Sequence, residues 1–169
     1  KKAIELKYAT PKVYNNLGIA LSNLKRYNQA MEAFRKGGTE AQAYNNLGVV
    51  YQKQARLDLA EQHFSKALQL DPGNIEARNN LGVCYNSKGL YDEAIAEFKK
   101  AIAIEPNHIK ARNNLGLAYE RKGLIDPALA EYKQAVKINP DYQQTHYNIA
   151  RLYLVRRRQN PELASLAAD

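Results

Sequence analysis

The chain has 169 residues and a net charge of +8, because 25 lysine and arginine residues outnumber 17 aspartate and glutamate residues. No stretch approaches 18 consecutive apolar residues, so the sequence predicts no transmembrane helix. The single cysteine, Cys84, excludes a disulfide within the chain. Ala118 occupies the equivalent position 34 residues later in the chain, so we interpret Cys84 as a buried apolar residue rather than a nucleophile. The length is that of one domain, residues 1–169.

A five-residue segment recurs along the chain with a basic period of 34 residues. It reads Tyr-Asn-Asn-Leu-Gly at 14–18 and 44–48, and Arg-Asn-Asn-Leu-Gly at 78–82 and 112–116, with a diverged copy at 146–150. A fixed period of this length indicates a solenoid, in which each repeat buries its apolar face against its neighbours. We divide the chain into a short repeat 11–40, full repeats 41–74, 75–108 and 109–142, and a partial or capping repeat 143–169.

Residues 1–10 match the end of a preceding repeat, because residues 2–6 align with residues 66–70. We therefore expect the chain to lack its true N-terminus, and we draw nothing from the lack of a signal peptide.

The pattern in each repeat predicts two amphipathic helices. In the repeat 41–74, Tyr44, Leu47 and Tyr51 lie on one face of the first helix. A break follows near Ala55, and the equivalent positions in the next two repeats are glycines, which favour a left-handed helix end. These glycines are Gly89 and Gly123.

The second helix of each repeat is expected to begin at an acidic N-cap. The candidates are Asp58, Asp92 and Asp126, with Pro127 at the first helical position. Small residues and one ring then recur at offsets 0, 4 and 7, which predicts a buried stripe. The stripe is Ala60, Phe64 and Ala67 in one repeat, and Ala128, Tyr132 and Ala135 in another. Each second helix should end before a proline, since proline disfavours helical geometry in the residue before it.

The repeat 11–40 is four residues shorter than the others. After Phe34 the chain continues through Gly37 and Gly38, with no Asp-Pro pair. Four residues equal about one helical turn, so we expect the second helix to lose a turn and to end at the glycine pair. Two interpretations stay open: a neutral deletion, or a local change in superhelical pitch that shapes a binding surface.

These patterns resemble the tetratricopeptide repeat (TPR) family over almost the whole chain. The tryptophan that many TPR units carry in the first helix is replaced here by Tyr14, Tyr44, Arg78, Arg112 and His146. The resemblance implies an all-α, right-handed superhelical solenoid of antiparallel helix pairs. It also implies a protein-interaction scaffold that binds an extended or helical peptide in a concave groove. The short first repeat resembles bacterial TPR proteins of envelope, pilus-assembly and secretion machinery.

The resemblance places one face of each first helix in this groove. The second asparagine of each copy lies there, and its amide suits the peptide groups of a ligand, as in the asparagine ladder of O-GlcNAc transferase and kinesin light chain. Duplication alone is the alternative explanation for this row. An apolar row beside it either contacts the adjacent repeat or forms a trough for ligand side chains, and basic residues favour acidic segments. The candidate groove residues are Asn16, Asn46, Asn80, Asn114, Asn148, Ile19, Val49, Val83, Leu117, Lys12, Lys53, Lys110, Arg121 and Arg151.

We expect no catalytic site, no metal site and no cofactor. The three histidines occupy different repeats and different positions, and none has a ligand partner at helical spacing. The arginine run 156–158 is interpreted as a solvated helix end, and nucleic acid is not an expected partner. The carboxylate clamp of co-chaperone TPR domains needs Lys and Asn where this chain has Asn15 and Ile19, so that mode of binding is not expected.

Two other functions stay open at this point. The repeat ends could stack between molecules and give homo-oligomers, as in a structural or assembly module. The chain could also be the regulatory arm of a larger enzyme, with a catalytic region outside residues 1–169. The compartment is not indicated, because the single cysteine suits a reduced cytoplasm as well as a periplasm.

Overall fold

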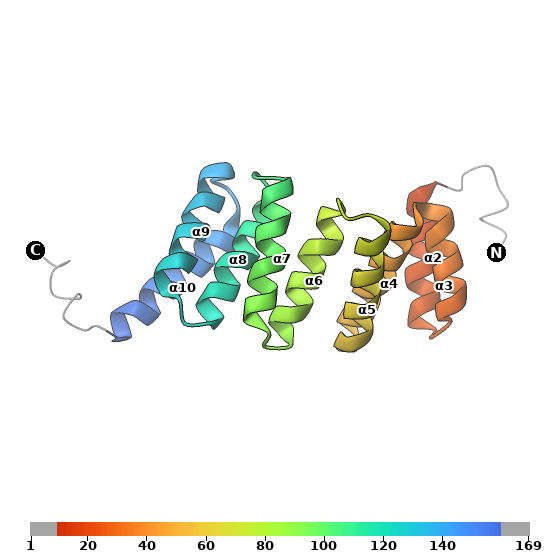
Figure 1. Ribbon diagram of the computed structural model, residues 1–169, viewed down its shortest axis with the longest axis horizontal. Coiled ribbons are helices and arrows are strands. Elements are labelled where there is room, and N and C mark those ends of the chain that lie inside the picture. The colour runs from red at the N-terminus through yellow and green to blue at the C-terminus, as the bar shows by residue number, and fades with distance from the viewer. Residues whose placement is uncertain (1–9, 160–169) are drawn as a thin grey trace, which may run out of the picture. The chain divides into compact units, whose positions relative to one another are not determined.

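The computed structural model describes residues 10–159, apart from the side chains of residues 157–159. Within this range every regular element is an α-helix (Figure 1), which confirms the predicted all-α repeat fold. The helices are α2 (Pro11–Asn23), α3 (Tyr27–Gly37), α4 (Glu40–Lys53), α5 (Leu57–Leu70), α6 (Ile75–Ser87), α7 (Tyr91–Ile104), α8 (Ile109–Arg121), α9 (Ile125–Ile138) and α10 (Gln143–Gln159).

The chain divides into two compact units. Unit 1 is residues 1–88 and contains α2 to α6, and unit 2 is residues 89–169 and contains α7 to α10. The single domain 1–169 stays a prediction. Residues 1–9 of the expected end of a preceding repeat (1–10) and residues 160–169 of the repeat 143–169 lie outside the described residues.

Helices in each unit pack on their sequence neighbours and on the next helix but one. In unit 1, α2 contacts α3 and α4, and α4 contacts α5 and α6. In unit 2, α8 contacts α7, α9 and α10. Within each unit, a first helix therefore packs against both its paired second helix and the next first helix, as a repeat protein requires.

Small residues and rings in the second helices form the core, as the sequence predicts. Ala60, Phe64 and Ala67 of α5 are each 0% exposed, and the same stripe in α9 is equally buried. The ring of Phe64 lies against Gly48 of α4, where an added Cβ atom would come within 2.7 Å of the ring. Glycine in the first helix thus lets the ring of the second helix approach its backbone.

The breaks between the paired helices fall where the sequence predicts. Gly89 and Gly123 have φ values of +78° and +85°, so both adopt the left-handed conformation that glycine favours. Lys25 and Ala55 take the same place in the first two repeats, with φ of 59° and 57°. Side chains with a Cβ atom are strained in this region, so these two turns are less favourable than the glycine turns.

The predicted acidic N-caps are wrong. The second helices begin at Leu57, Tyr91 and Ile125, one residue before each aspartate, and their N-cap residues make no side-chain capping bond. The apolar first residue extends the helix because it joins the core: Leu57 and Ile125 pack against the buried clusters of their units. The aspartates therefore lie inside the first turn, where negative charge still complements the helix dipole. Pro127 is tolerated one position later, because N–H groups of the first turn have no helical acceptor.

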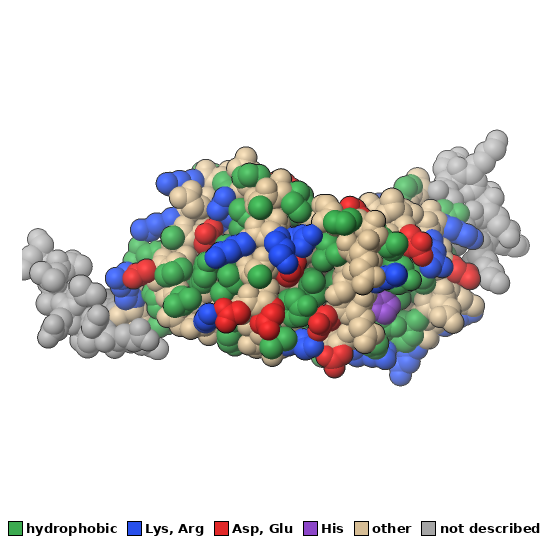
Figure 2. All heavy atoms as spheres, in the orientation of Figure 1, with side chains coloured by type: hydrophobic (Ala, Val, Ile, Leu, Met, Phe, Trp, Pro, Cys, Tyr) green, Lys and Arg blue, Asp and Glu red, His purple; other side chains and the backbone are tan. Residues whose placement is uncertain are grey.

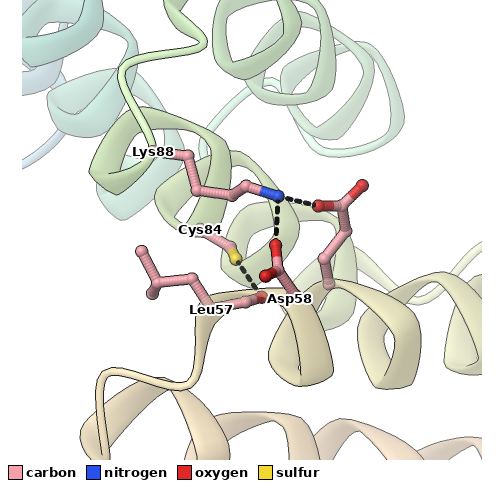
Figure 3. A network of polar contacts seen from close by, with 5 residues as sticks. Leu57, Asp58, Cys84 and Lys88 are labelled. Atoms are coloured by element: carbon pink, nitrogen blue, oxygen red, sulfur yellow. Dashed lines mark hydrogen bonds and ion pairs between the residues drawn. The ribbon is translucent and has the colours of Figure 1, made fainter.

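These aspartates form ion pairs with the following repeat instead. Asp58 binds Lys88 at 2.8 Å, and Lys88 also reaches Glu61 at 2.7 Å; Figure 3 shows this network beside Cys84. Equivalent pairs join Asp92 to Lys122, and Asp126 to Arg156 at 3.3 Å. The pairs are exposed, so each one contributes about 0–1 kcal/mol. The pairs help to position neighbouring repeats, since each one links the start of a second helix to the end of the next first helix.

Cys84 lies beneath the ion pairs of Lys88 and is 0% exposed, as expected for a buried small residue. Its thiol donates a weak hydrogen bond to the carbonyl oxygen of Leu57, with a sulfur–oxygen distance of 3.3 Å (Figure 3). Burial raises the pKa of this thiol, and the nearby carboxylate of Glu61 adds to the shift. Cys84 therefore stays a neutral packing residue.

The first repeat has the predicted short second helix. α3 has 11 residues against 14 in α5, and it ends at Gly37. The next helix is fixed by a capping box at Thr39, whose hydroxyl accepts from the backbone N–H of Gln42 while the Gln42 side chain accepts from the backbone N–H of Thr39. A direct turn from α3 into α4 therefore replaces the proline-containing connections of the other repeats.

Candidate functional site

The repeated asparagines link neighbouring first helices in pairs. Nδ2 of Asn46 donates to Oδ1 of Asn15 at 3.3 Å, and Nδ2 of Asn80 donates to Oδ1 of Asn45 at 2.9 Å. The same bond joins Asn148 to Asn113 at 3.0 Å in unit 2. The second asparagine of one repeat therefore binds the first asparagine of the preceding repeat.

This pairing gives the repeated asparagines a structural role, besides the ligand contact and the duplication considered for the row. Asn148 is 3% exposed, and its amide group is used inside unit 2. Asn46, Asn80 and Asn114 are half-buried, and Asn16 is exposed. The adjacent first asparagines, which the sequence analysis left out of the site, are the acceptors. The signal for them was present, because both asparagines recur with the same period.

A hollow of about 420 Å³ lies between α2 and α4 in unit 1. The apolar side chains of Ile19 and Val49 form its wall together with the ring of Phe34, which comes from α3. Ile19 is 46% exposed, so this wall is open to a ligand. The complete lining is Asn15, Ile19, Asn23, Phe34, Asn46, Val49, Val50, Lys53 and Gln54.

A second hollow of about 540 Å³ adjoins the first and shares Asn15 and Asn46 with it. Its other lining residues are Pro11, Gly37, Gly38 and Gln42. A Cβ atom on Gly37 would come within 2.8 Å of Oδ1 of Asn15, so glycine is needed where the short α3 ends. We call the two hollows together the α2/α4 trough, with the hydrogen-bonded amides of Asn15 and Asn46 where they meet.

Four of the expected groove residues line this trough: Asn46, Ile19, Val49 and Lys53. The lining also contains residues that the repeat pattern did not indicate, because the shape of the trough depends on how the short α3 ends: Phe34, Val50, Gln54, Gln42 and the two glycines. Val49 lines the trough and also packs against the unit 1 core. Lys12 and Asn16 are exposed on α2, and Asn80 and Val83 are half-buried on α6.

The remaining expected groove residues belong to unit 2. Lys110 and Arg121 are exposed on α8, and Asn114 and Leu117 are half-buried. Arg151 is not a free cation, since its guanidinium binds Oε2 of Glu120 at 2.9 Å. Glu120 also accepts a hydrogen bond from the hydroxyl of Tyr132 at 3.1 Å, and burial with this carboxylate raises the pKa of that hydroxyl. Arg151 therefore belongs to a half-buried polar network of unit 2.

The charge around the α2/α4 trough is positive. Residues 10–53 contain six lysines and arginines but two glutamates, and one of these, Glu40, binds Arg35 at 2.8 Å. Lys53 is the charged residue of the lining, and the other polar groups there are amides. The side chains visible in Figure 2 have both charges interspersed with apolar groups.

Two negative results concern the described residues 10–159. They contain no group of three or more His, Cys, Asp or Glu side chains placed to hold a metal ion. In the same range, no helix combines the length and the apolar composition needed to cross a membrane.

The sequence and the fold both match known proteins. Models of the tetratricopeptide repeat match residues 11–37, 39–104 and 73–141. The chain is similar to the structure of YrrB, a TPR protein with an unusual peptide-binding site, at 28% identity and a TM-score of 0.66, covering 87% of this chain and 78% of that chain. It is also similar to MamA, at 28% identity and a TM-score of 0.63, covering 85% and 86%.

Similarity of fold alone extends to pilF of Pseudomonas aeruginosa. That structure is 24% identical in sequence with a TM-score of 0.71, and the match covers 88% of this chain and 69% of that chain. No curated protein sequence matches the chain. The repeat models cover most of residues 11–141, which is well over half of the chain. The chain belongs to the tetratricopeptide repeat family.

Proposed function

We propose that this protein is a protein-interaction scaffold that binds a segment of another protein in the α2/α4 trough. The preferred segment is extended and carries an apolar side chain next to carboxylates. The observation that carries this proposal is the junction of two hollows at a hydrogen-bonded amide pair. The proposal is supported by the similarity to YrrB, which is described as a TPR protein with an unusual peptide-binding site.

The amide pair suits the main chain of an extended ligand. A carboxamide has two N–H donors and an acceptor oxygen, and the bond between Asn46 and Asn15 uses one donor and one acceptor. No hydrogen bond donated by the Asn15 amide is found among the described residues, and Asn15 lines both hollows, so its two N–H groups would be available to a ligand acceptor. Each hydrogen bond to a ligand peptide group would contribute about 1 kcal/mol net.

The apolar wall suits one side chain of the ligand. Ile19, Val49 and Phe34 surround the larger apolar part of the trough, and Ile19 is the most exposed of them. Complete burial of a leucine-sized side chain contributes about 1.5–3 kcal/mol. Together with two main-chain hydrogen bonds, this gives an affinity in the range of weak, reversible peptide binding.

The cationic surroundings favour an acidic segment. Lys53 lies on the lining, and cations outnumber carboxylates over residues 10–53. Charges of this kind speed association and select partners more than they add affinity. The effect should therefore weaken as the salt concentration rises.

The test begins with the selection of displayed peptides on the full chain. Selected peptides are titrated by fluorescence anisotropy against the native protein, Ile19→Ser and Leu24→Ser. Leu24 is the matched control, because it is a 67% exposed apolar residue outside the trough lining. We expect Ile19→Ser to weaken binding about tenfold, which is 1.4 kcal/mol, and Leu24→Ser to leave it unchanged. Equal affinity of the native protein and Ile19→Ser would refute binding in the trough.

A second pair of variants tests the charge preference. Lys53→Glu should weaken binding of acidic peptides and reduce its salt dependence, while Lys36→Glu, which lies outside the trough lining, should not. The preference for acidic segments is wrong if the selected peptides carry no excess of Asp and Glu.

A further inference from the structure

Three carboxamide side chains in the lining of the α2/α4 trough have their oxygens engaged inside the protein. In the second hollow, Oε1 of Gln42 accepts from the backbone N–H of Thr39 at 2.9 Å. In the first hollow, Oε1 of Gln54 accepts from the hydroxyl of Tyr27 at 3.0 Å. Oδ1 of Asn15, which lines both hollows, accepts from the partner asparagine of its pair at 3.3 Å. Each bond fixes which end of the amide faces the protein.

The partners of these amides determine the direction of the bonds. A backbone N–H can only donate, so the near atom of Gln42 is its oxygen. Nη1 of Arg56 donates to the hydroxyl oxygen of Tyr27 at 3.1 Å, and a guanidinium cannot accept in return. The proton of the Tyr27 hydroxyl is thus left for Gln54, whose oxygen accepts it. The bond to Asn15 has the same direction as the two other asparagine bonds between first helices.

The trough therefore offers a ligand mainly hydrogen-bond donors. No hydrogen bond donated by these three amides is found within residues 10–159, so two N–H bonds on each of them are left for a ligand. Lys53 adds an ammonium group, which can only donate. Among the described residues, the side-chain oxygens of the lining that accept no hydrogen bond are those of Asn23 and Asn46. A ligand that matches this lining is rich in acceptors and poor in donors.

We propose that the α2/α4 trough selects an extended segment that contains proline. The inference rests on the proposed binding of a protein segment in this trough, and it names the chemistry of that segment. Proline has a main-chain carbonyl acceptor but no main-chain N–H. Its apolar ring can pack on the wall formed by Ile19, Val49 and Phe34. Leucine or valine would bring its own N–H group to a lining with few acceptors, and a donor that loses water without finding an acceptor weakens binding.

The polyproline II conformation suits this set of donors better than a helix does. A polyproline II segment has no internal hydrogen bonds, so its carbonyl groups are free to accept from the amides of both hollows. The carbonyl groups of a helical segment are already used within the helix, so the trough donors would find no acceptor on it. A segment that is extended before it binds also loses less conformational entropy on binding. The donors of the lining therefore favour an extended ligand over a helical one.

Fluorescence anisotropy on the full chain with three labelled peptides tests the preference for proline. The peptides share the same glutamate-rich flanks, and their central run is proline, alanine or N-methylalanine. We expect the proline peptide to bind about tenfold more tightly than the alanine peptide. The N-methylalanine peptide, which lacks the N–H groups but has no ring, should bind with an affinity between the other two. Ile19→Ser should weaken binding of the proline peptide, and Leu24→Ser, outside the lining, should not.

Substitutions of Gln42 test the amide donors themselves. Gln42→Glu keeps an oxygen for the backbone N–H of Thr39, as glutamate does in a capping box, so the helicity measured by circular dichroism should be unchanged. It removes the N–H groups, and binding of the proline peptide should weaken about fivefold. The neutral variant Gln42→Met should weaken binding by the same factor, which separates the lost donor from charge repulsion. Gln29→Glu is the matched control, because Gln29 is exposed in the first turn of α3 and lies outside the lining.

The outcomes separate this inference from the proposed function. If Ile19→Ser weakens all three peptides but alanine binds as tightly as proline, the preference for proline is overturned and the trough stays the binding site. Weaker binding of the N-methylalanine peptide than of the alanine peptide has the same consequence. If both Gln42 variants bind the proline peptide like the native chain, the amide donors do not select the ligand and the inference is wrong. Binding that is insensitive to Ile19→Ser, or no binding of the proline peptide, overturns the inference together with the trough as its site.

Discussion

The substitution Gly48→Ala tests how closely the paired helices α4 and α5 approach each other. A Cβ atom there would lie 2.7, 2.8 and 3.2 Å from three atoms of the Phe64 ring. Ordinary carbon contacts are about 3.5–4.0 Å, so the ring or the helix must move by most of an ångström. Such overpacking costs about 1–3 kcal/mol, and the better helix propensity of alanine offsets about 1 kcal/mol. We expect a net loss of about 1 kcal/mol.

Urea and thermal unfolding followed by circular dichroism measure this change, which should lower the Tm by about 2–4 °C per kcal/mol. Phe64→Leu supplies the second arm of a double-mutant cycle, because a smaller side chain makes room for the new methyl group. The double variant should be more stable than the sum of the single changes predicts, by about 1 kcal/mol. Gly73→Ala is the control, since the nearest atom there is 3.4 Å away. Additive effects within about 0.5 kcal/mol would refute the contact.

The turns and the asparagine pairs give two more predictions. Ala55→Gly should stabilise the protein by about 0.5–1 kcal/mol, and Gly89→Ala should destabilise it by a similar amount, because both positions have left-handed φ; opposite signs in urea unfolding check this. Asn113→Ala should cost about 1–3 kcal/mol, because Asn148 and Thr145 both donate to its side-chain oxygen and would be left unsatisfied in a buried site. A Tm unchanged by Asn113→Ala would contradict the structural role of the pair.

The sequence predicted those features that depend on local periodicity. The stripe of Phe64 and its small neighbours, the left-handed Gly89 and the shortened α3 all follow from spacing within one repeat. The predicted N-cap at Asp58 failed because the apolar Leu57 gains more from joining the core than an aspartate gains from capping.

Contacts between repeats were beyond the sequence patterns. The bond between Asn46 and Asn15 joins residues 31 apart, and its existence depends on how neighbouring helices stack. Arg151 looked like a free groove cation, but Glu120, 31 residues earlier, neutralises it. Helical spacing put Ile19 and Val49 on one stripe of their helices, and the family resemblance assigned that stripe to the groove, while the hollow they share depends on where α3 ends.

The ion pairs that join successive repeats bear on how such a chain can lengthen during evolution. The repeats 75–108 and 109–142 each supply an acid at the start of their second helix and a base at the end of their first, as with Asp92 and Lys88, whereas the repeat 41–74 has Gln54 at the position of the base. A duplicated 34-residue segment would carry both halves of this link, so a new copy could join its neighbours without further substitution. The first repeat lacks the acid, and the hydroxyl of Tyr27 donates to Gln54 at 3.0 Å in its place. Gene growth by copying internal repeats would preserve these links, whereas copying the first repeat into the interior would break one.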